Sequence, residues 1–126
     1  MNKLEMVFAA KKKGVLNMYC TAGFPKLEST TEVLLALQES GADIIELGMP
    51  YSDPVADGPV IQQSNIQALE NGISIVKIFE QLQSVKSQLT VPVILMGKSG
   101  KIMPLTPASS AAAQNFSNPN CITGFR

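Results

Sequence analysis

The sequence of 126 residues contains no histidine. This absence excludes histidine general bases, the Ser-His and Cys-His couples of nucleophilic catalysis, and most zinc sites. Any acid–base chemistry must therefore come from carboxylates, tyrosine or lysine.

Cysteine, net charge and long apolar runs are scarce as well. Cys20 and Cys121 are too few and too far apart for a disulfide framework. Ten basic residues balance ten acidic ones, so no net field attracts nucleic acid or an anionic membrane. No apolar run has the length of a signal-peptide core or a membrane span. We therefore expect a cytoplasmic protein with free thiols and with no nucleic-acid or membrane partner.

The residues that are present favour one modest folded domain, because hydrophobic residues make up 45% of the chain. Their spacing predicts helices over residues 3–12, 29–39, 59–71 and 74–88, and strands over residues 15–20, 43–47 and 91–97. The third helix has four apolar positions, which are Val60, Ile61, Ile66 and Leu69.

This order of elements is typical of βα units around a parallel sheet. A doubly wound sheet and a barrel both begin in this way, and the pattern alone does not choose between them. In both folds the functional groups gather at the carboxyl ends of the strands. Those ends carry Tyr19, Glu46 and Met96.

Glu46 is unusual because it interrupts an apolar strand. Burying a carboxylate without a partner costs several kcal/mol, so such a residue is either paired or functional. A structural ion pair is the simpler interpretation. However, no lysine or arginine lies between Lys26 and Lys77 to supply a local partner. We therefore favour a functional carboxylate that gives and takes a proton.

Two aspartates follow in the loop after this strand. Asp57 precedes Gly58-Pro59, so it is also a candidate cap of the helix that Pro59 opens. Asp53 precedes a proline and is also a candidate turn residue. Together with Glu46 they place three carboxylates at one strand end. A metal-dependent lyase that uses these three as oxygen ligands is one alternative to direct acid–base chemistry.

Three segments resemble the alpha subunit of tryptophan synthase in their order and spacing: YCTAGFP, SGADIIELGMPYSDPVADGPVIQ and VPVILMG. The second segment is long and irregular, so chance is a poor explanation. The resemblance covers residues 1–97 and implies the N-terminal part of a (β/α)8 TIM barrel, about three βα units. It also implies a carbon–carbon lyase of tryptophan biosynthesis, which cleaves indole-3-glycerol phosphate to indole and glyceraldehyde 3-phosphate.

The same resemblance implies roles for individual residues. Glu46 matches the family's catalytic glutamate, and Asp57 matches the aspartate that holds the indole N–H. Tyr19 takes the place of an aromatic residue that lines the indole pocket. The resemblance implies no metal and no cofactor in this chain. Pyridoxal phosphate belongs to the beta subunit, which is the expected partner in an alpha2-beta2 complex.

The texture changes after Gly97. Residues 98–126 contain no acidic residue and no useful apolar period, so we expect an irregular, disordered and non-homologous tail. A whole barrel takes about 250 residues. We therefore expect impaired catalysis, and the alternative is a non-catalytic fragment that at most docks on the beta subunit.

The genetic code offers an explanation of this tail. The codons possible for residues 111–116, reverse-complemented and read one base out of frame, permit Lys-Phe-Cys-Ala-Ala. The same frame permits Asn-Pro-Val-Met-Gln-Phe-Gly across residues 118–125 and Gly-Val-Asn-Gly-Ile-Ile-Leu-Pro-Asp across residues 98–107. In sense order these three blocks resemble the next segment of the family. Our hypothesis is a DNA inversion, by recombination or misassembly, and the alternative is coincidence helped by codon degeneracy.

This hypothesis predicts the nucleotide sequence of the gene. Beyond the codon of Gly97, the reverse complement should encode continuous barrel sequence that contains the three blocks. Sequencing both strands of the locus is the measurement. A reverse complement without such a reading frame would leave coincidence as the explanation.

Overall fold

The computed structural model describes residues 3–50, 57–97 and 121–125. Within these ranges the helices are α1 (Lys3–Ala10), α2 (Ser29–Glu39), α3 (Pro59–Glu70) and α4 (Ile75–Val85). The strands are β1 (Asn17–Thr21), β2 (Ile44–Gly48), β3 (Val93–Gly97) and β4 (Cys121–Phe125). Each predicted helix and strand of residues 1–97 is present, with shifts of a few residues at the ends.

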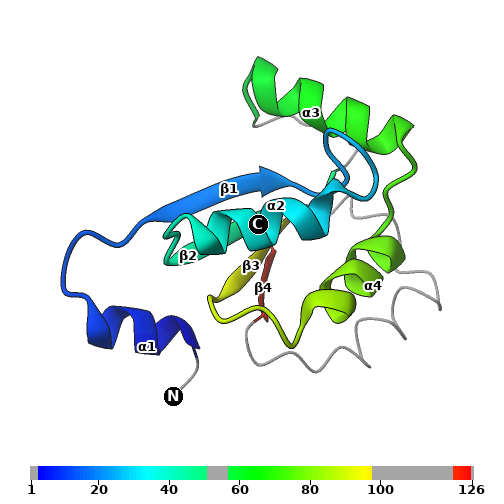
Figure 1. The fold of residues 1–126 in the computed structure, drawn as a ribbon. Coiled ribbons are helices and arrows are strands. Elements are labelled where there is room, and N and C mark those ends of the chain that lie inside the picture. The colour runs from blue at the N-terminus through cyan, green and yellow to red at the C-terminus, as the bar shows by residue number, and fades with distance from the viewer. Residues whose placement is uncertain (1–2, 51–56, 98–120, 126) are drawn as a thin grey trace.

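The four strands form one parallel sheet in the order β1-β2-β3-β4 (Figure 1). In the register of the first three strands, Tyr19 lies beside Glu46 and Glu46 lies beside Ile94. The predicted α/β class with a parallel sheet is confirmed. All strand ends of one polarity therefore meet at the same edge of the sheet.

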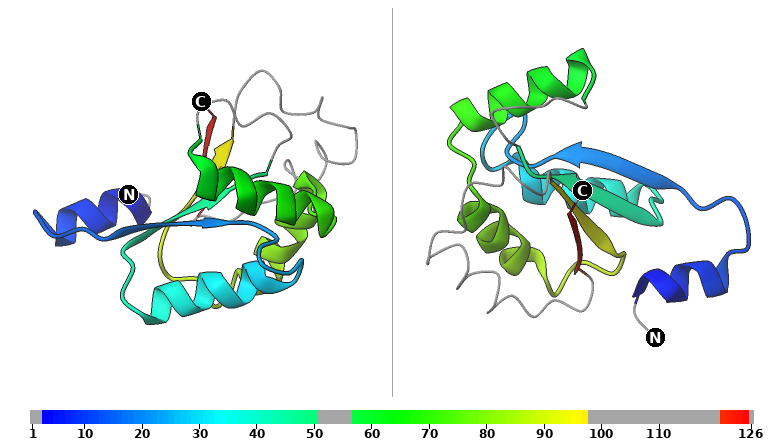
Figure 2. Two further views of the ribbon diagram at one scale, coloured as in Figure 1. Left: turned by 90° about the horizontal axis from the view of Figure 1, so that it is seen from above. Right: turned by 180° about the vertical axis from the view of Figure 1, so that it is seen from behind.

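The core lies between one face of the sheet and the helices α2 and α4 (Figures 1 and 2). Along β2, Ile45 and Leu47 are fully buried against these helices, whereas Glu46 between them is only half-buried. Val93 and Leu95 repeat this alternation on β3. Burying such aliphatic side chains contributes roughly 1.5–3 kcal/mol each. The buried face therefore fixes which residues of each strand point to the other face.

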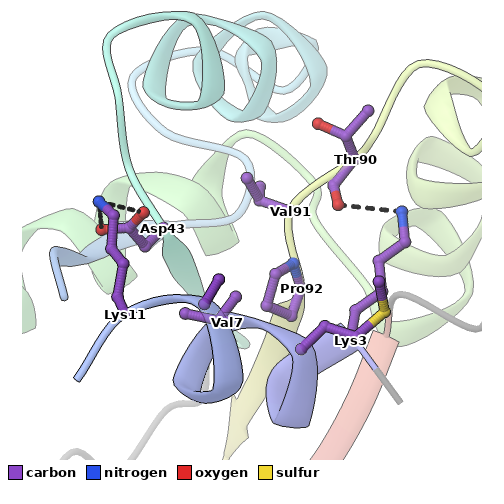
Figure 3. A pocket seen from close by; sticks show the side chains of 9 residues that line it. Lys3, Val7, Lys11, Asp43, Thr90, Val91 and Pro92 are labelled. Atoms are coloured by element: carbon purple, nitrogen blue, oxygen red, sulfur yellow. Dashed lines mark hydrogen bonds and ion pairs between the residues drawn. The ribbon is translucent and has the colours of Figure 1, made fainter. Parts of the chain in front are cut away.

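Helix α1 packs at the amino ends of the strands. Lys3 donates to the carbonyl oxygen of Thr90 at 2.9 Å, and Lys11 forms an ion pair with Asp43 at 2.8 Å. Val7 lies between these two links, and the space beside it is a largely apolar cavity of about 370 Å³ (Figure 3). The cavity is at the end of the sheet opposite to Glu46. It belongs to the packing of α1.

Small and polar residues form the buried face of α3. Val60 is 80% exposed and Ile66 is 52% exposed, whereas Ser64, Asn65 and Ala68 are buried. The four apolar positions of this helix therefore do not form its buried face. The physical reason is its position: α3 packs against β1, and its inward side chains make polar contacts at the end of that strand.

Strand β4 lies in the segment for which the sequence predicts no regular structure. Its backbone pairs with β3 over five positions, from Val93↔Cys121 to Gly97↔Phe125. An unpaired edge strand exposes a row of N–H and C=O groups, so a short partner strand at this edge satisfies them. The expectation of a wholly irregular tail is wrong for these five residues. No helix in the described ranges is long and apolar enough to cross a membrane.

The link between α1 and the sheet should depend on pH. The N–H of Leu16 donates to Asp43 at 2.9 Å, and this bond, with the Lys11 ammonium group, lowers the pKa of Asp43 below 3.8. A lowered folded-state pKa stabilises the fold above the unfolded pKa, and this stabilisation is lost as the pH falls below about 4.

We predict that Asp43→Asn lowers the urea midpoint of unfolding at neutral pH and has a smaller effect at about pH 3. Circular dichroism during urea titration is the measurement. Glu39→Gln, which removes an exposed carboxylate at the end of α2, is the matched control. Equal effects of Asp43→Asn at both pH values would contradict the prediction.

Candidate active site

The carboxyl ends of β1, β2 and β3 are tied together through backbone hydrogen bonds. The N–H of Ala22 donates to Gly48 at 3.0 Å, and the N–H of Met49 donates to Met96 at 2.8 Å. These bonds continue the sheet into the loops. Backbone hydrogen bonds therefore hold together the edge of the sheet at which the sequence predicts function.

Glu46 points to the face of the sheet that α2 and α4 do not cover. Its Oε1 accepts a hydrogen bond from Nδ2 of Asn17 at 2.8 Å. In the described part of the chain the ion pairs are Lys11–Asp43 and Lys77–Glu80, so Glu46 has none there. The structure thus gives this carboxylate an uncharged partner in place of the ion pair that was the simpler interpretation.

Asp57 lies just before α3, but it is not the N-cap of this helix. Gly58 holds that position, and no side chain donates or accepts there as a cap. Instead, Oδ2 of Asp57 accepts from Nδ2 of Asn65 at 3.4 Å, and the Asp57 carbonyl accepts from Gln62 at 2.7 Å. Both donors come from α3, so the helix holds Asp57 at its own start.

Tyr19 lies beside Glu46 in the register of β1 and β2. Burial raises the pKa of its phenol above 10.0, although a hydrogen bond with Thr21 acts in the opposite direction. The negative charges of Asp57 and Glu46 raise the pKa of Tyr19 further. The ring lies across Gly48: a Cβ at Gly48 would overlap the Tyr19 hydroxyl and stand 2.7 Å from Cζ. Glycine at this position therefore makes room for the tyrosine.

Polar contacts hold the loop after β1 against α3. The hydroxyl groups of Thr21 and Ser64 are 2.8 Å apart and buried. Asn71, just after α3, donates to the carbonyl oxygens of Gly23 and Pro25 at 2.9 and 2.8 Å. The first contact joins β1 to α3, and the second joins the loop after β1 to the end of α3. Together they limit the movement of β1, which carries Tyr19, relative to α3, which follows Asp57.

Of the predicted residues, Tyr19 and Glu46 lie side by side in the middle of β1 and β2, and Asp57 lies just before α3. Asp53 lies outside the described residues. Sequence reasoning missed the two amides that contact the carboxylates, Asn17 and Asn65. The signal for Asn17 was a polar residue two positions before Tyr19, on the same face of the strand.

The structure also bears on a thiol nucleophile and on a metal site. Burial raises the pKa of the Cys20 thiol to about 12, so this thiol is protonated at neutral pH. Residues 3–50 and 57–97 contain no group of three or more cysteines, aspartates or glutamates that could hold a metal ion. The metal-dependent alternative includes Asp53, which lies outside these ranges, so this alternative stays a prediction.

The close packing of Tyr19 on Gly48 leads to a prediction. In a Tyr51→Phe background, Tyr19 is the only tyrosine. Gly48→Ala should push the ring toward solvent and away from the carboxylates, so the raised pKa of Tyr19 should fall toward 10.0. Spectrophotometric titration of the phenol is the measurement.

Gly58→Ala is the matched control, because a Cβ at Gly58 meets nothing within 4 Å. If both alanine variants leave the titration of Tyr19 unchanged, the ring does not depend on Gly48.

Comparison with known proteins identifies a single family. A family model described as tryptophan synthase alpha chain matches residues 6–115. The tryptophan synthase alpha chain of Parabacteroides distasonis is 47% identical over 103 residues, which cover 82% of this chain and 40% of that protein. The alpha chain of Karelsulcia muelleri is 48% identical over 97 residues, which cover 77% and 39%.

Solved structures agree. The tryptophan synthase alpha subunit of Legionella pneumophila matches with a TM-score of 0.73 and 39% identity, over 78% of this chain and 39% of that chain. The tryptophan synthase complex of Pyrococcus furiosus matches with a TM-score of 0.67 and 38% identity, over 79% and 43%.

The chain spans about 40% of the length of these relatives. This share fits the predicted fold, a partial TIM barrel of about three βα units. The family match continues to residue 115, past the predicted boundary at residue 97, and that boundary stays a prediction. The family model matches most of this chain, and the relatives are nearly half identical to it. The chain therefore belongs to the tryptophan synthase alpha chain family.

Proposed function

We propose that this chain carries the catalytic carboxylates for cleavage of indole-3-glycerol phosphate to indole and glyceraldehyde 3-phosphate. The observation that supports this most is the register of β1 and β2, which sets Tyr19 beside Glu46. The charge of Asp57 also acts on the Tyr19 phenol. Family membership supports the assignment of a lyase reaction to this site.

The proposed reaction needs two carboxyl groups with different roles. In its acid form, Glu46 gives a proton to C3 of the indole ring, and positive charge develops on the ring nitrogen. The carboxylate of Asp57 accepts a hydrogen bond from the ring N–H and stabilises this charge. Glu46, now ionised, takes the proton of the adjacent side-chain hydroxyl. The bond between C3 and the side chain then breaks, its electron pair restores the aromatic ring, and the hydroxyl carbon becomes the aldehyde.

The environment of each group suits its role. Glu46 has only an uncharged hydrogen-bond donor, so no fixed cation in the described ranges locks it in the ionised form. The side chain of Asp57 accepts from Asn65, which holds the carboxylate at the start of α3. Tyr19, in register with Glu46, supplies an aromatic ring on which a planar substrate ring can stack.

The proposal includes a beta subunit as partner. The match to the Pyrococcus furiosus tryptophan synthase complex supports it, because that structure is of an assembly. Pyridoxal phosphate would be held by the beta subunit, and no residue of this chain is assigned to it. The cytoplasmic location expected from the sequence also stays a prediction.

A second candidate is a non-catalytic polypeptide that docks on the beta subunit. The observation that favours it is the share of the relatives' length that the chain spans, about 40%. The two candidates differ in one measurable quantity, which is indole release.

We predict that the purified chain, mixed with beta subunit, releases indole from indole-3-glycerol phosphate. Glu46→Gln should reduce the rate by at least about 10²-fold, because it removes the proton donor and acceptor. Assays with and without beta subunit measure the effect of the partner. Glu32→Gln, an exposed change on α2, is the matched control and should keep the rate.

No indole release in either assay, together with binding to the beta subunit, would support the docking candidate instead. Equal rates for the chain and Glu46→Gln would remove Glu46 from the mechanism.

A further inference from the structure

Asn17 is the one described residue that donates a side-chain hydrogen bond to Glu46, with 2.8 Å between Nδ2 and Oε1. The two residues lie on neighbouring strands. Asn17 is in register with Ile44, so it is one layer below Glu46 on the same face of the sheet. Its side chain therefore reaches toward the carboxyl edge to meet the carboxylate.

The contact involves one oxygen of the carboxylate. Within the described ranges Oε2 of Glu46 makes no hydrogen bond, and the covered face of the sheet is on the other side. A carboxyl group held through one oxygen has a fixed orientation and keeps the other oxygen available for proton transfer. Tyr19 on β1 is the titratable residue in register with Glu46, and the charges of Glu46 and Asp57 both act on its phenol.

The donor is an amide, which has a chemical consequence. An amide N–H can donate to Oε1 when Glu46 is ionised and also when the proton is on Oε2. A lysine or arginine would instead favour the ionised form strongly. Asn17 therefore suits a carboxyl group that changes its protonation state during turnover.

A purely structural role explains the contact less well. β1 and β2 are already paired through their backbones from Asn17↔Ile44 to Thr21↔Gly48. Asn17 itself is exposed, and an exposed side-chain hydrogen bond adds little to a five-residue ladder.

We propose that Asn17 is a positioning residue for Glu46, which orients the carboxyl group for proton transfer to the indole ring. This proposal rests on the proposed function. Asn17 acts through Glu46 and does not itself exchange a proton.

The first test is independent of turnover. In protein labelled with ¹⁵N at asparagine, the side-chain NH₂ signals of Asn17 should change with pH through one inflection, as the carboxyl group that they contact titrates. Asn17→Leu identifies these signals by their loss. The inflection should disappear in Glu46→Gln and persist in the control Asp57→Asn. If the pH inflection of the Asn17 signals is unchanged in Glu46→Gln, the proposal is overturned, whether or not the chain releases indole.

The second test is kinetic and uses the full chain with beta subunit. Asn17→Leu should lower kcat about tenfold, part of the usual 10²–10⁴-fold contribution of a general acid–base group, while KM stays within about twofold. In the Glu46→Gln background, Asn17→Leu should have no further effect.

The urea midpoint of Asn17→Leu separates positioning from structure, and it should stay that of the parent chain. A lowered midpoint with unchanged kcat would assign Asn17 a structural role only. Absence of indole release from the parent chain would overturn the proposed function, and the NMR test would still decide whether Asn17 holds Glu46.

Discussion

The structure depends on one constraint, which is that successive side chains of a strand point to opposite faces of the sheet. Ile45 and Leu47 are fully buried beneath α2 and α4, so Glu46 between them must point to the other face. A register shift by one residue would place the carboxylate in the core and two aliphatic side chains outside it. The hydrophobic core therefore sets the direction of Glu46, although the hydrogen-bond donor to its side chain, Asn17, is not a core residue.

Helix α3 contributes polar contacts to the site and little apolar burial to the core. Its buried face carries Ser64 and Asn65, and these contact Thr21 and Asp57. Within the described residues, Oδ1 of Asn65 has no hydrogen-bond partner. An unpaired buried acceptor costs about 1–3 kcal/mol. We infer that polar contacts, and not apolar burial, set the position of α3 at the end of β1. Asp57 directly precedes this helix and is held by it.

The order and type of the elements in residues 1–97 could be predicted. The short apolar run at Ile44–Leu47 indicates a strand, and the spacing of apolar residues in Ile78–Leu82 indicates a helix. The face of α3 could not be predicted from its apolar residues, because its environment is a polar strand end and not the core. β4 was missed for a related reason: it pairs with β3 through its backbone, and a five-residue stretch of this kind has no distinctive period. The position of Glu46 was visible as an interrupted apolar run, whereas its contact with Asn17 depends on strand register, which a sequence alone does not give.

The absence of histidine and the nature of the partner of Glu46 are connected. In a chain without histidine, acid–base chemistry must come from carboxyl groups, tyrosine or lysine, and the proposed function assigns it to a carboxyl group. A carboxyl group can act in both directions only if its surroundings do not favour the ionised form too strongly. A cation beside Glu46 would do so, and the described ranges place the amide of Asn17 there instead. Tyr19 is the neighbour of Glu46 across the two strands. The uncharged contact is thus the feature that makes a glutamate at this strand end compatible with proton transfer in both directions.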